Sequence, residues 1–143
     1  MRKISTNELE NKIKKARDVK EFKGILSELP EMNLSARLEQ LCCAYQMTFS
    51  QVQVASGITK SLFYAMLNGT RKPQKGHILK IAVAMGVTPE EANELLKLAG
   101  QKELYAKNKE DAIILFGLKN RLNITQMEEL LTDTGCRFHL IAD

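Results

Sequence analysis

The segment between residues 56 and 73 is polar and basic, although apolar segments flank it on both sides; it reads SGITKSLFYAMLNGTRKP. Thr59 is of the type that caps a helix. Lys60, Ser61 and Tyr64 would share one side of the short helix that follows. Ammonium and hydroxyl groups on one exposed helix side can donate hydrogen bonds to phosphates and to base edges. The segment therefore indicates binding to a polyanion.

The distribution of charge also favours a polyanionic partner. The chain has 21 Lys and Arg against 17 Asp and Glu, a net charge of +4, but no carboxylate occurs between Glu39 and Glu90. The cationic residues inside that gap are Lys60, Arg71, Lys72, Lys75 and Lys80. Because no local carboxylate cancels these charges, a polyanion is their natural partner. The alternative is a solvated surface that lacks acids by chance.

Size and composition are those of an ordinary globular protein. The chain has 143 residues, of which 44% are hydrophobic and 27% charged, which suits either one compact domain or a small domain with an appendage. No apolar run approaches the ~20 residues of a membrane span, and no apolar stretch of a secretory signal follows the basic start. Three cysteines do not make a disulfide framework. We therefore expect free thiols and a cytoplasmic location.

Nearly every apolar segment has helical spacing, and no alternating run is long enough to predict a strand. The expected helices begin at capping residues and end near glycine or proline. Their approximate ranges are 5–15, 18–30, 33–45, 48–57, 59–69, 75–85, 88–100, 108–118 and 123–135. The predicted fold class is therefore all-α.

A faint repeat with a shift of 35 residues connects two parts of the second half of the chain. It places Ile78 on Ile113 and Gly100 on Gly135. Each unit would be a helix, a short turn, a second helix and a glycine stop, so the repeat predicts two stacked helical hairpins. The alternative is a chance match.

Residues 48–69 together have the pattern of a helix-turn-helix, in which two short helices are joined by a tight turn that contains glycine. Gly57 suits this turn because glycine adopts the left-handed backbone at least cost. The apolar positions at which the two helices would pack are Val52, Ile58, Phe63 and Met66. The polar first turn of the second helix would then enter the major groove of DNA with its N-terminal residues at base edges.

This segment resembles the phage-repressor (Cro-like, Xre-type) helix-turn-helix transcriptional regulators. The resemblance is carried by TFSQVQVASGITKSLFYAMLNGTRKP at 48–73, by HILKIAVAMGV at 77–87 and by the TPEEANELL that follows. It implies a lambda-repressor-like five-helix DNA-binding domain, commonly dimeric, which we expect at residues 33–99. A helical extension at 1–32 and a helical hairpin with a tail at 100–143 would complete the chain.

The resemblance also implies which residues contact double-stranded DNA. The base-facing positions would be Thr59, Lys60, Ser61, Tyr64 and Ala65. The positions at the DNA backbone would be Thr48, Ser50, Gln51, Asn68, Arg71 and Lys72. The first three of these lie at a helix N-terminus, where backbone N–H groups favour anions.

Several positions depart from the family pattern. Phe49 stands where a glutamine often supplies a phosphate-binding amide. Gln53 stands where a small residue is usual, and its longer side chain could loosen the helix pair. Leu62 and Ala65 can touch a thymine methyl group, but neither can hydrogen-bond a base.

Other side chains capable of chemistry form no recognisable catalytic or metal site. Cys136 and His139 are close in sequence, but structural zinc needs four converging ligands, so ordinary thiols are expected. For His77 we expect a surface or capping role. The carboxylates at 110–111 and 128–129 are interpreted as charges that complement helix N-termini. We therefore expect neither enzymatic activity nor a cofactor or metal.

The sequence thus predicts a sequence-dependent, double-stranded-DNA-binding transcriptional regulator that places helix 59–68 in the major groove. The alternative is a protein-interaction adaptor that keeps the scaffold and uses Leu62, Tyr64 and Ala65 to bind another protein. A homodimer formed through the C-terminal helices, with the apolar segment 112–118 at its surface, is a further expectation.

Overall fold

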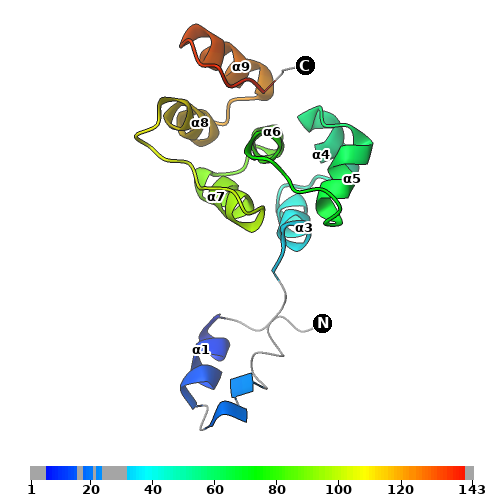
Figure 1. Cartoon of the computed structure of the whole chain (residues 1–143), viewed down its shortest axis with the longest axis vertical. Helices are drawn as coiled ribbons and strands as arrows, with labels where there is room; N and C mark the ends of the chain where they lie inside the picture. The colour runs from blue at the N-terminus through cyan, green and yellow to red at the C-terminus, as the bar shows by residue number, and fades with distance from the viewer. Residues whose placement is uncertain (1–5, 16–17, 21, 24–31, 141–143) are drawn as a thin grey trace. The chain divides into compact units, whose positions relative to one another are not determined.

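A computed structural model describes residues 6–15, 18–20, 22–23 and 32–140 of the chain (Figure 1). The chain divides into two units, Met1–Met32 and Asn33–Asp143. In the first unit the structure describes the helix α1 (Thr6–Lys15). The helix expected at 18–30 lies largely outside the described residues.

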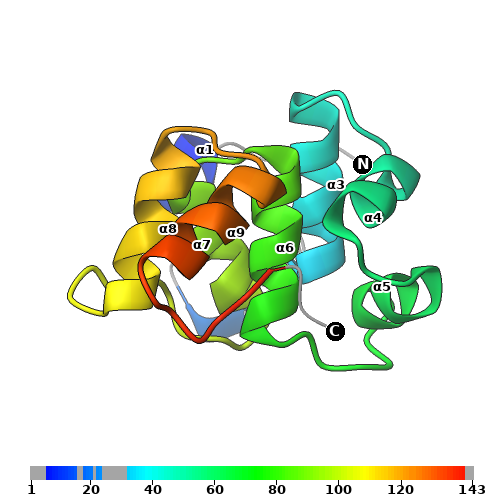
Figure 2. The same cartoon turned by 90° about the horizontal axis from the view of Figure 1, so that it is seen from above.

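The second unit is built from helices. In chain order they are α3 (Leu34–Ala44), α4 (Phe49–Ser56), α5 (Lys60–Leu67), α6 (Lys75–Met85), α7 (Pro89–Leu98), α8 (Lys109–Lys119) and α9 (Ile124–Asp133) (Figure 2). No strand occurs among the described residues. The all-α prediction is therefore confirmed.

Local sequence determines where most of these helices begin and end. Three of them start with a complete capping box, in which the side chains of the cap and of the third helical residue accept each other's backbone N–H; the pairs are Thr48–Gln51, Thr88–Glu91 and Asn123–Gln126. Pro89 occupies the first helical position of α7, where no backbone donor is needed. Gly57 ends α4 in the left-handed conformation, as predicted.

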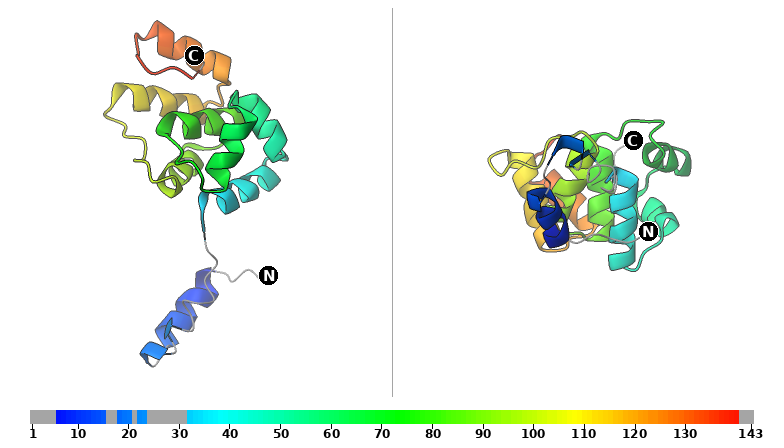
Figure 3. Two further views of the ribbon diagram at one scale, coloured as in Figure 1. Left: turned by 45° about the vertical axis from the view of Figure 1, so that its right-hand side comes forward. Right: turned by 90° about the horizontal axis from the view of Figure 1, so that it is seen from below.

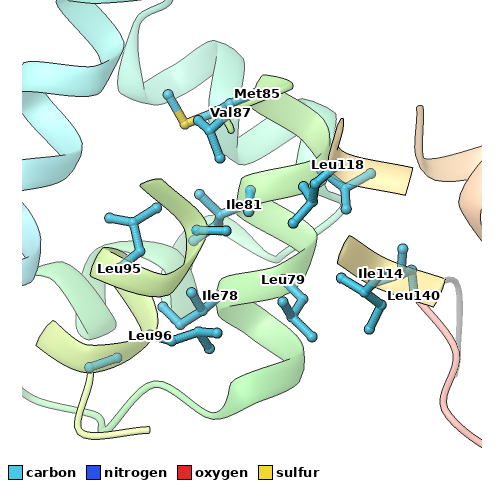
Figure 4. Packing of buried hydrophobic residues seen from close by; sticks show 14 of the residues in the cluster. Ile78, Leu79, Ile81, Met85, Val87, Leu95, Leu96, Ile114, Leu118 and Leu140 are labelled. Carbon is cyan, nitrogen blue, oxygen red and sulfur yellow. The ribbon is translucent and has the colours of Figure 1, made fainter. Parts of the chain in front are cut away.

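The core lies where α6 and α7 pack against α4 and α3. All four apolar positions predicted to join the helix-turn-helix are buried: Val52, Ile58, Phe63 and Met66. They meet the apolar stripe of α6, part of which is visible in Figure 4 as Ile78 and Ile81. The helix pair at 48–69 therefore rests on the rest of the unit through its apolar side and leaves the opposite side to solvent.

The structure confirms the predicted pair of C-terminal hairpins, α6–α7 and α8–α9. Gly86 and its counterpart Arg121 both have positive φ angles, 72° and 54°, and Gly100 and Gly135 follow with 75° and 74°. The backbone N–H of Val87 donates to the carbonyl of Ala82. The backbone N–H of Leu122, 35 residues further on, donates to the carbonyl of Gly117 in the same way. Figure 3 shows α6 and α7 between α3 on one side and α8 and α9 on the other.

No helix among the described residues combines the length and the apolar character that a bilayer span requires.

Candidate nucleic-acid interface

The turn between α4 and α5 is held by side chains of α4. Gly57 has a φ of 73°, which allows the chain to reverse between the helices. The Gln53 side-chain amide donates to the carbonyl of Ile58 at 2.5 Å. The buried Ser56 hydroxyl donates to the Gln53 carbonyl at 3.0 Å and lies 3.4 Å from the backbone N–H of Ile58, which donates to it. Gln53 therefore holds the turn through a hydrogen bond, a role that sequence reasoning did not predict.

The helix α5 has one side in the protein and one side in solvent. Phe63 and Met66 are buried, whereas Thr59, Lys60 and Ser61 are exposed at its N-terminal end. Thr59 caps the helix, because its hydroxyl oxygen accepts the backbone N–H of Leu62 at 3.3 Å. The cap leaves the Thr59 hydroxyl proton free to donate to a partner.

The side chain of Tyr64 is 37% exposed. Two neighbouring aromatic rings orient it. Its ring meets Phe63 edge to face, with centroids 5.3 Å apart. Phe63 in turn meets Phe49 edge to face at 6.2 Å. Such edge-to-face pairs stabilise by roughly 0.5–1.5 kcal/mol beyond the area they bury. Phe49 thus supports the exposed face of α5, a role that sequence reasoning missed.

At the start of α4, Thr48, Ser50 and Gln51 are exposed. Two of these side chains already have bonds within the capping box: the Thr48 hydroxyl accepts Gln51 N–H at 3.1 Å, and the Gln51 carbonyl oxygen accepts Thr48 N–H at 2.8 Å. Both bonds use the acceptor atoms of these side chains. Their hydroxyl and amide protons are not used in these bonds, so both side chains can still donate to a phosphate.

The loop after α5 is held in one shape by Asn68. Its side-chain oxygen accepts the backbone N–H of Thr70 at 3.0 Å and also the Thr70 hydroxyl. The backbone N–H groups of Thr70 and Arg71 both donate to the carbonyl of Ala65, at 2.9 and 3.1 Å. Arg71 is exposed, and in the described part of the chain it forms no salt bridge. Its guanidinium is therefore available to a ligand.

Lys72 is less free than Arg71, although it too is exposed. The end of its side chain lies beside Gly100, which follows α7 with a φ of 75°. The C-terminus of a helix carries partial negative charge, and this attracts an ammonium group. The ammonium group of Lys72 therefore lies where the C-terminal end of α7 attracts it.

Lys75 is withdrawn from the basic surface. Its ammonium group lies 2.7 Å from Oδ1 of Asp111, which is buried, and Oδ2 of Asp111 accepts the backbone N–H of Tyr105 at 2.9 Å. Lys75 has no local carboxylate, as the sequence indicated, but a carboxylate distant in sequence neutralises it. The interpretation of Asp111 as a carboxylate that serves the helix dipole is also incomplete, since it joins α8 to α6.

His77 lies among positive charges beside the loop. Burial lowers its pKa below the ordinary value of 6.5, and the charges of Lys80 and Arg71 lower that pKa further. Its Nδ1 is buried without a hydrogen-bond partner among the described residues, and the N-cap of α6 is Gln74. His77 is therefore not the cap of α6, and its side chain is half-buried at the surface. Its position does show that Arg71 and Lys80 act on the same region of the surface.

Two of the remaining carboxylates, Glu110 and Glu128, bind the C-terminal segment 137–140. His139 Nδ1 lies 2.6 Å from Oε1 of Glu128, whose other oxygen accepts Leu140 N–H at 2.7 Å. Glu110 accepts the backbone N–H groups of Arg137 and Phe138. Glu110 and Glu128 thus bind the tail as well as standing near helix starts. All three cysteines are free thiols, and no three His, Cys, Asp or Glu side chains are grouped to hold a metal within the described ranges.

The fold brings the predicted base-facing residues together on one open side of α5. In Figures 1 and 2, α5 lies with α4 at the edge of the second unit opposite to α8 and α9. The C-terminal hairpin therefore does not cover Lys60, Ser61 or Tyr64. The predicted backbone residues flank this side from two directions, the start of α4 and the loop after α5.

Comparison with known protein families identifies the part of the chain that contains this helix pair. Residues 33–95 match the family model described as "Helix-turn-helix domain". Neither a curated protein nor a solved structure matches the chain. The matched range begins at the cap of α3 and ends within α7, so it includes the whole helix pair and its supporting helices. The second unit of this chain thus contains a helix-turn-helix domain.

Proposed function

We propose that the protein is a cytoplasmic, sequence-dependent regulator of transcription, of the phage-repressor (Cro-like, Xre-type) kind, which binds double-stranded DNA. The observation that carries this proposal is the polar, exposed N-terminal side of α5, held on a helix-turn-helix whose other side is buried. A helix supported in this way can enter a major groove, which accepts a single α-helix.

The base-facing set would be Thr59, Lys60, Ser61, Tyr64 and Ala65. Lys60 supplies a cation long enough to reach the acceptor atoms of guanine, and the Ser61 and Thr59 hydroxyls can donate or accept. Ala65 offers a methyl group to thymine. Because this set contains neither arginine nor an amide side chain for bidentate contacts, we expect discrimination at only a few base pairs.

Contacts with the DNA backbone would fix the position of α5. The set proposed for this role is Thr48, Ser50, Gln51, Asn68, Arg71 and Lys72. The Gln51 amide protons, the Asn68 amide protons and the Arg71 guanidinium are donors outside the bonds that shape the turn and the loop. Donors of this kind position a protein on a duplex without reading its sequence.

Selection of duplexes from a random pool by the full chain tests this function directly. We expect enrichment of a short motif, and binding of the selected duplex that weakens linearly in log–log form with a slope of about −0.9 per neutralised phosphate. If no duplex is retained at low salt, the proposal fails. The exposed Tyr64 and the half-buried Leu62 and Ala65 would then become the surface of a protein-interaction adaptor.

Two paired copies would present two such helices to a palindromic operator, one helical turn apart, ~34 Å.

A further inference from the structure

The two C-terminal hairpins carry equivalent apolar residues on one face, but these residues differ in burial. Ile81 of α6 is 2% exposed, whereas Phe116, 35 residues further on in α8, is 57% exposed. The same shift relates three other pairs, in which Ile78, Val87 and Leu95 are buried and Ile113, Leu122 and Leu130 are half-buried. The second hairpin thus exposes to solvent a face that the first hairpin buries.

The difference arises because further helices pack on the first hairpin. α6 and α7 pack against α4 and α3, whereas α8 and α9 have extensive contacts, among the described helices, only with α6, α7 and each other. Figure 4 shows Ile78, Ile81 and Leu95 close to one another, on the side of α6 away from Ile114. We call their counterparts on the second hairpin, with Leu122, the open face: Ile113, Phe116, Leu122 and Leu130. Exposed apolar side chains that lie together mark an interaction surface.

The open face lies on a tightly packed pair of helices. A Cβ added to Gly117 of α8 would lie only 2.1 Å from Cε of Met127 on α9. The backbone N–H of Leu122 donates to the Gly117 carbonyl at 2.9 Å and holds the start of the turn between the two helices. A surface that is already rigid loses little conformational freedom when a partner binds it.

In the first hairpin, an ion pair fixes one of the helices that cover the equivalent face. The guanidinium of Arg37 on α3 binds both carboxylate oxygens of Glu94 on α7, at 2.9 and 3.2 Å. Such bidentate pairs give geometric specificity as well as affinity. The counterpart of Glu94 on α9 is Glu129, which is exposed. The second hairpin thus has the carboxylate of this pair without the helix that supplies the cation.

The cations of the second hairpin leave Glu129 unpaired. Lys109 donates to the Thr134 carbonyl at 2.6 Å, and the cations at the other end of α8 line a pocket with the start of α7. Within the described residues, no ion pair with Glu129 is formed by any of four nearby cations in the sequence: Lys109, Lys119, Arg121 and Arg137. The Glu129 carboxylate can therefore accept a guanidinium or ammonium group from a partner.

We propose that the open face binds an amphipathic helix of another protein, which carries an arginine or lysine that pairs with Glu129. α3 indicates the pattern of such a helix, because its buried leucines are Leu34, Leu38 and Leu41 and Arg37 directly precedes the second of them. The partner helix therefore has apolar residues at positions i, i+4 and i+7 and a basic residue at i+3. Anchors at such spacing are how amphipathic helices bind apolar surfaces.

A helix bound at the open face would leave the proposed DNA-binding surface uncovered. α5 lies at the edge of the second unit opposite to α8 and α9 (Figure 2). Helix binding itself does not depend on DNA; only its use in regulating transcription rests on the proposed function. Measuring helix binding without DNA therefore separates a failure of this proposal from a failure of DNA binding.

A bridged peptide with the sequence of α3 is the probe for the first test. It contains residues 33–45 with Cys43→Lys, and an amide bond joins the introduced ammonium group to Glu39. Positions 39 and 43 are both exposed on α3, so the bridge holds the peptide helical without touching its apolar side. We expect the labelled peptide to bind the full chain saturably, as measured by fluorescence anisotropy.

Two substitutions in the full chain locate the peptide. Phe116→Asp should weaken binding at least about tenfold, because it removes the central aromatic contact of the open face. Val54→Asp is the matched control, since Val54 is a 70% exposed apolar residue on α4, and it should leave the affinity unchanged. Absence of saturable binding to the wild-type chain, or equal losses in the two variants, would overturn the proposal.

A charge swap tests the pairing with Glu129. Glu129→Arg should weaken binding of the peptide about tenfold, and a peptide with Arg37→Glu should bind this variant more tightly than it binds the wild-type chain. Glu94→Arg is the control, because Glu94 is the equivalent carboxylate of the first hairpin, and it should not affect the peptide. If the affinity follows the charge at position 94 instead, the peptide has replaced α3 in the first hairpin and the proposal fails.

Sedimentation of the full chain without peptide distinguishes a partner helix from a second copy of the chain. We expect Phe116→Asp to leave the sedimentation of the chain unchanged, because the open face is assigned to another protein. Self-association that Phe116→Asp abolishes, and that saturating peptide does not reverse, would assign the open face to a second copy and overturn the proposal.

Discussion

Lys60 is the residue from which we expect most of the sequence discrimination. It is exposed on the first turn of α5, and in the described part of the chain it has no salt bridge that would hold it back. Lys60→Ala should lower affinity for a selected duplex by about 1–3 kcal/mol and change the preferred base at one position. Gel shifts with the parent duplex and its single-base variants measure both effects. Lys107→Ala, an exposed lysine ahead of α8, is the control and should bind as the parent does.

Arg71 should contribute affinity without discrimination. Its backbone N–H is fixed to the Ala65 carbonyl at 3.1 Å, so the guanidinium extends from a loop of one shape. Arg71→Ala should weaken selected and unrelated duplexes alike and make the salt slope shallower by about 0.9. Titrations at several salt concentrations measure the slope. A loss confined to the selected duplex would instead place Arg71 at a base.

Residues whose role depends on a distant partner could not be assigned from the sequence. The exposure of Lys60, Ser61 and Tyr64 follows from their spacing on a short helix, so the pattern predicted it. The roles of Gln53 and Phe49 depend on groups that only the folded turn brings close. Lys75 meets a carboxylate 36 positions away. No local pattern indicates such pairs.

At the scale of the element, the turn of the helix-turn-helix depends on Gly57. A Cβ added there would meet no atom within 4 Å, so any cost of substitution comes from the backbone at φ 73°. Gly57→Ala should therefore destabilise the fold by about 1–2 kcal/mol. Urea unfolding measures this difference. Gly57→Asn should cost less, because asparagine tolerates the left-handed conformation; equal losses would show that strain of the left-handed backbone is not the cause.

The boundaries of the elements were the most predictable part of the fold, because their determinants are local. The capping pairs at the starts of α4, α7 and α9 lie within one turn, and each can be recognised in the sequence. The repeat was visible for the same reason, since the helix starts and stops recur at one spacing. Which helices of the two hairpins touch each other could not be foreseen, because that depends on tertiary packing.

At the scale of the whole molecule, long-range bonds join the elements that support α5. Lys75 and Asp111 join the start of α6 to α8, and the Arg37 guanidinium binds Glu94 between α3 and α7 at 2.9 Å. The hydroxyl of Tyr45, at the end of α3, donates to Oε1 of Glu91 in the first turn of α7. These bonds fix the helices behind the proposed DNA-binding surface.

Glu91 makes this support sensitive to acid. Burial alone would raise its pKa, but hydrogen bonds from Tyr45 and Thr88 outweigh burial and lower the pKa below the ordinary 4.5. The folded state then binds the proton less readily than the unfolded state, so the stability that Glu91 contributes is complete above pH 4.5 and is lost as the pH falls through the lower folded value. Glu91→Gln should therefore reduce the loss of unfolding free energy between about pH 5 and pH 3.

Glu91→Gln removes the titrating carboxylate without removing the helix cap, because glutamine can still complete the capping box with Thr88. Urea unfolding at a series of pH values measures the dependence in both proteins. Adding Tyr45→Phe to the Glu91→Gln variant should change its stability at every pH by the same amount, since the titrating partner is already gone. If wild type and Glu91→Gln lose stability in parallel on acidification, the bond between α3 and α7 does not depend on the charge of Glu91, and acid unfolding begins at another carboxylate.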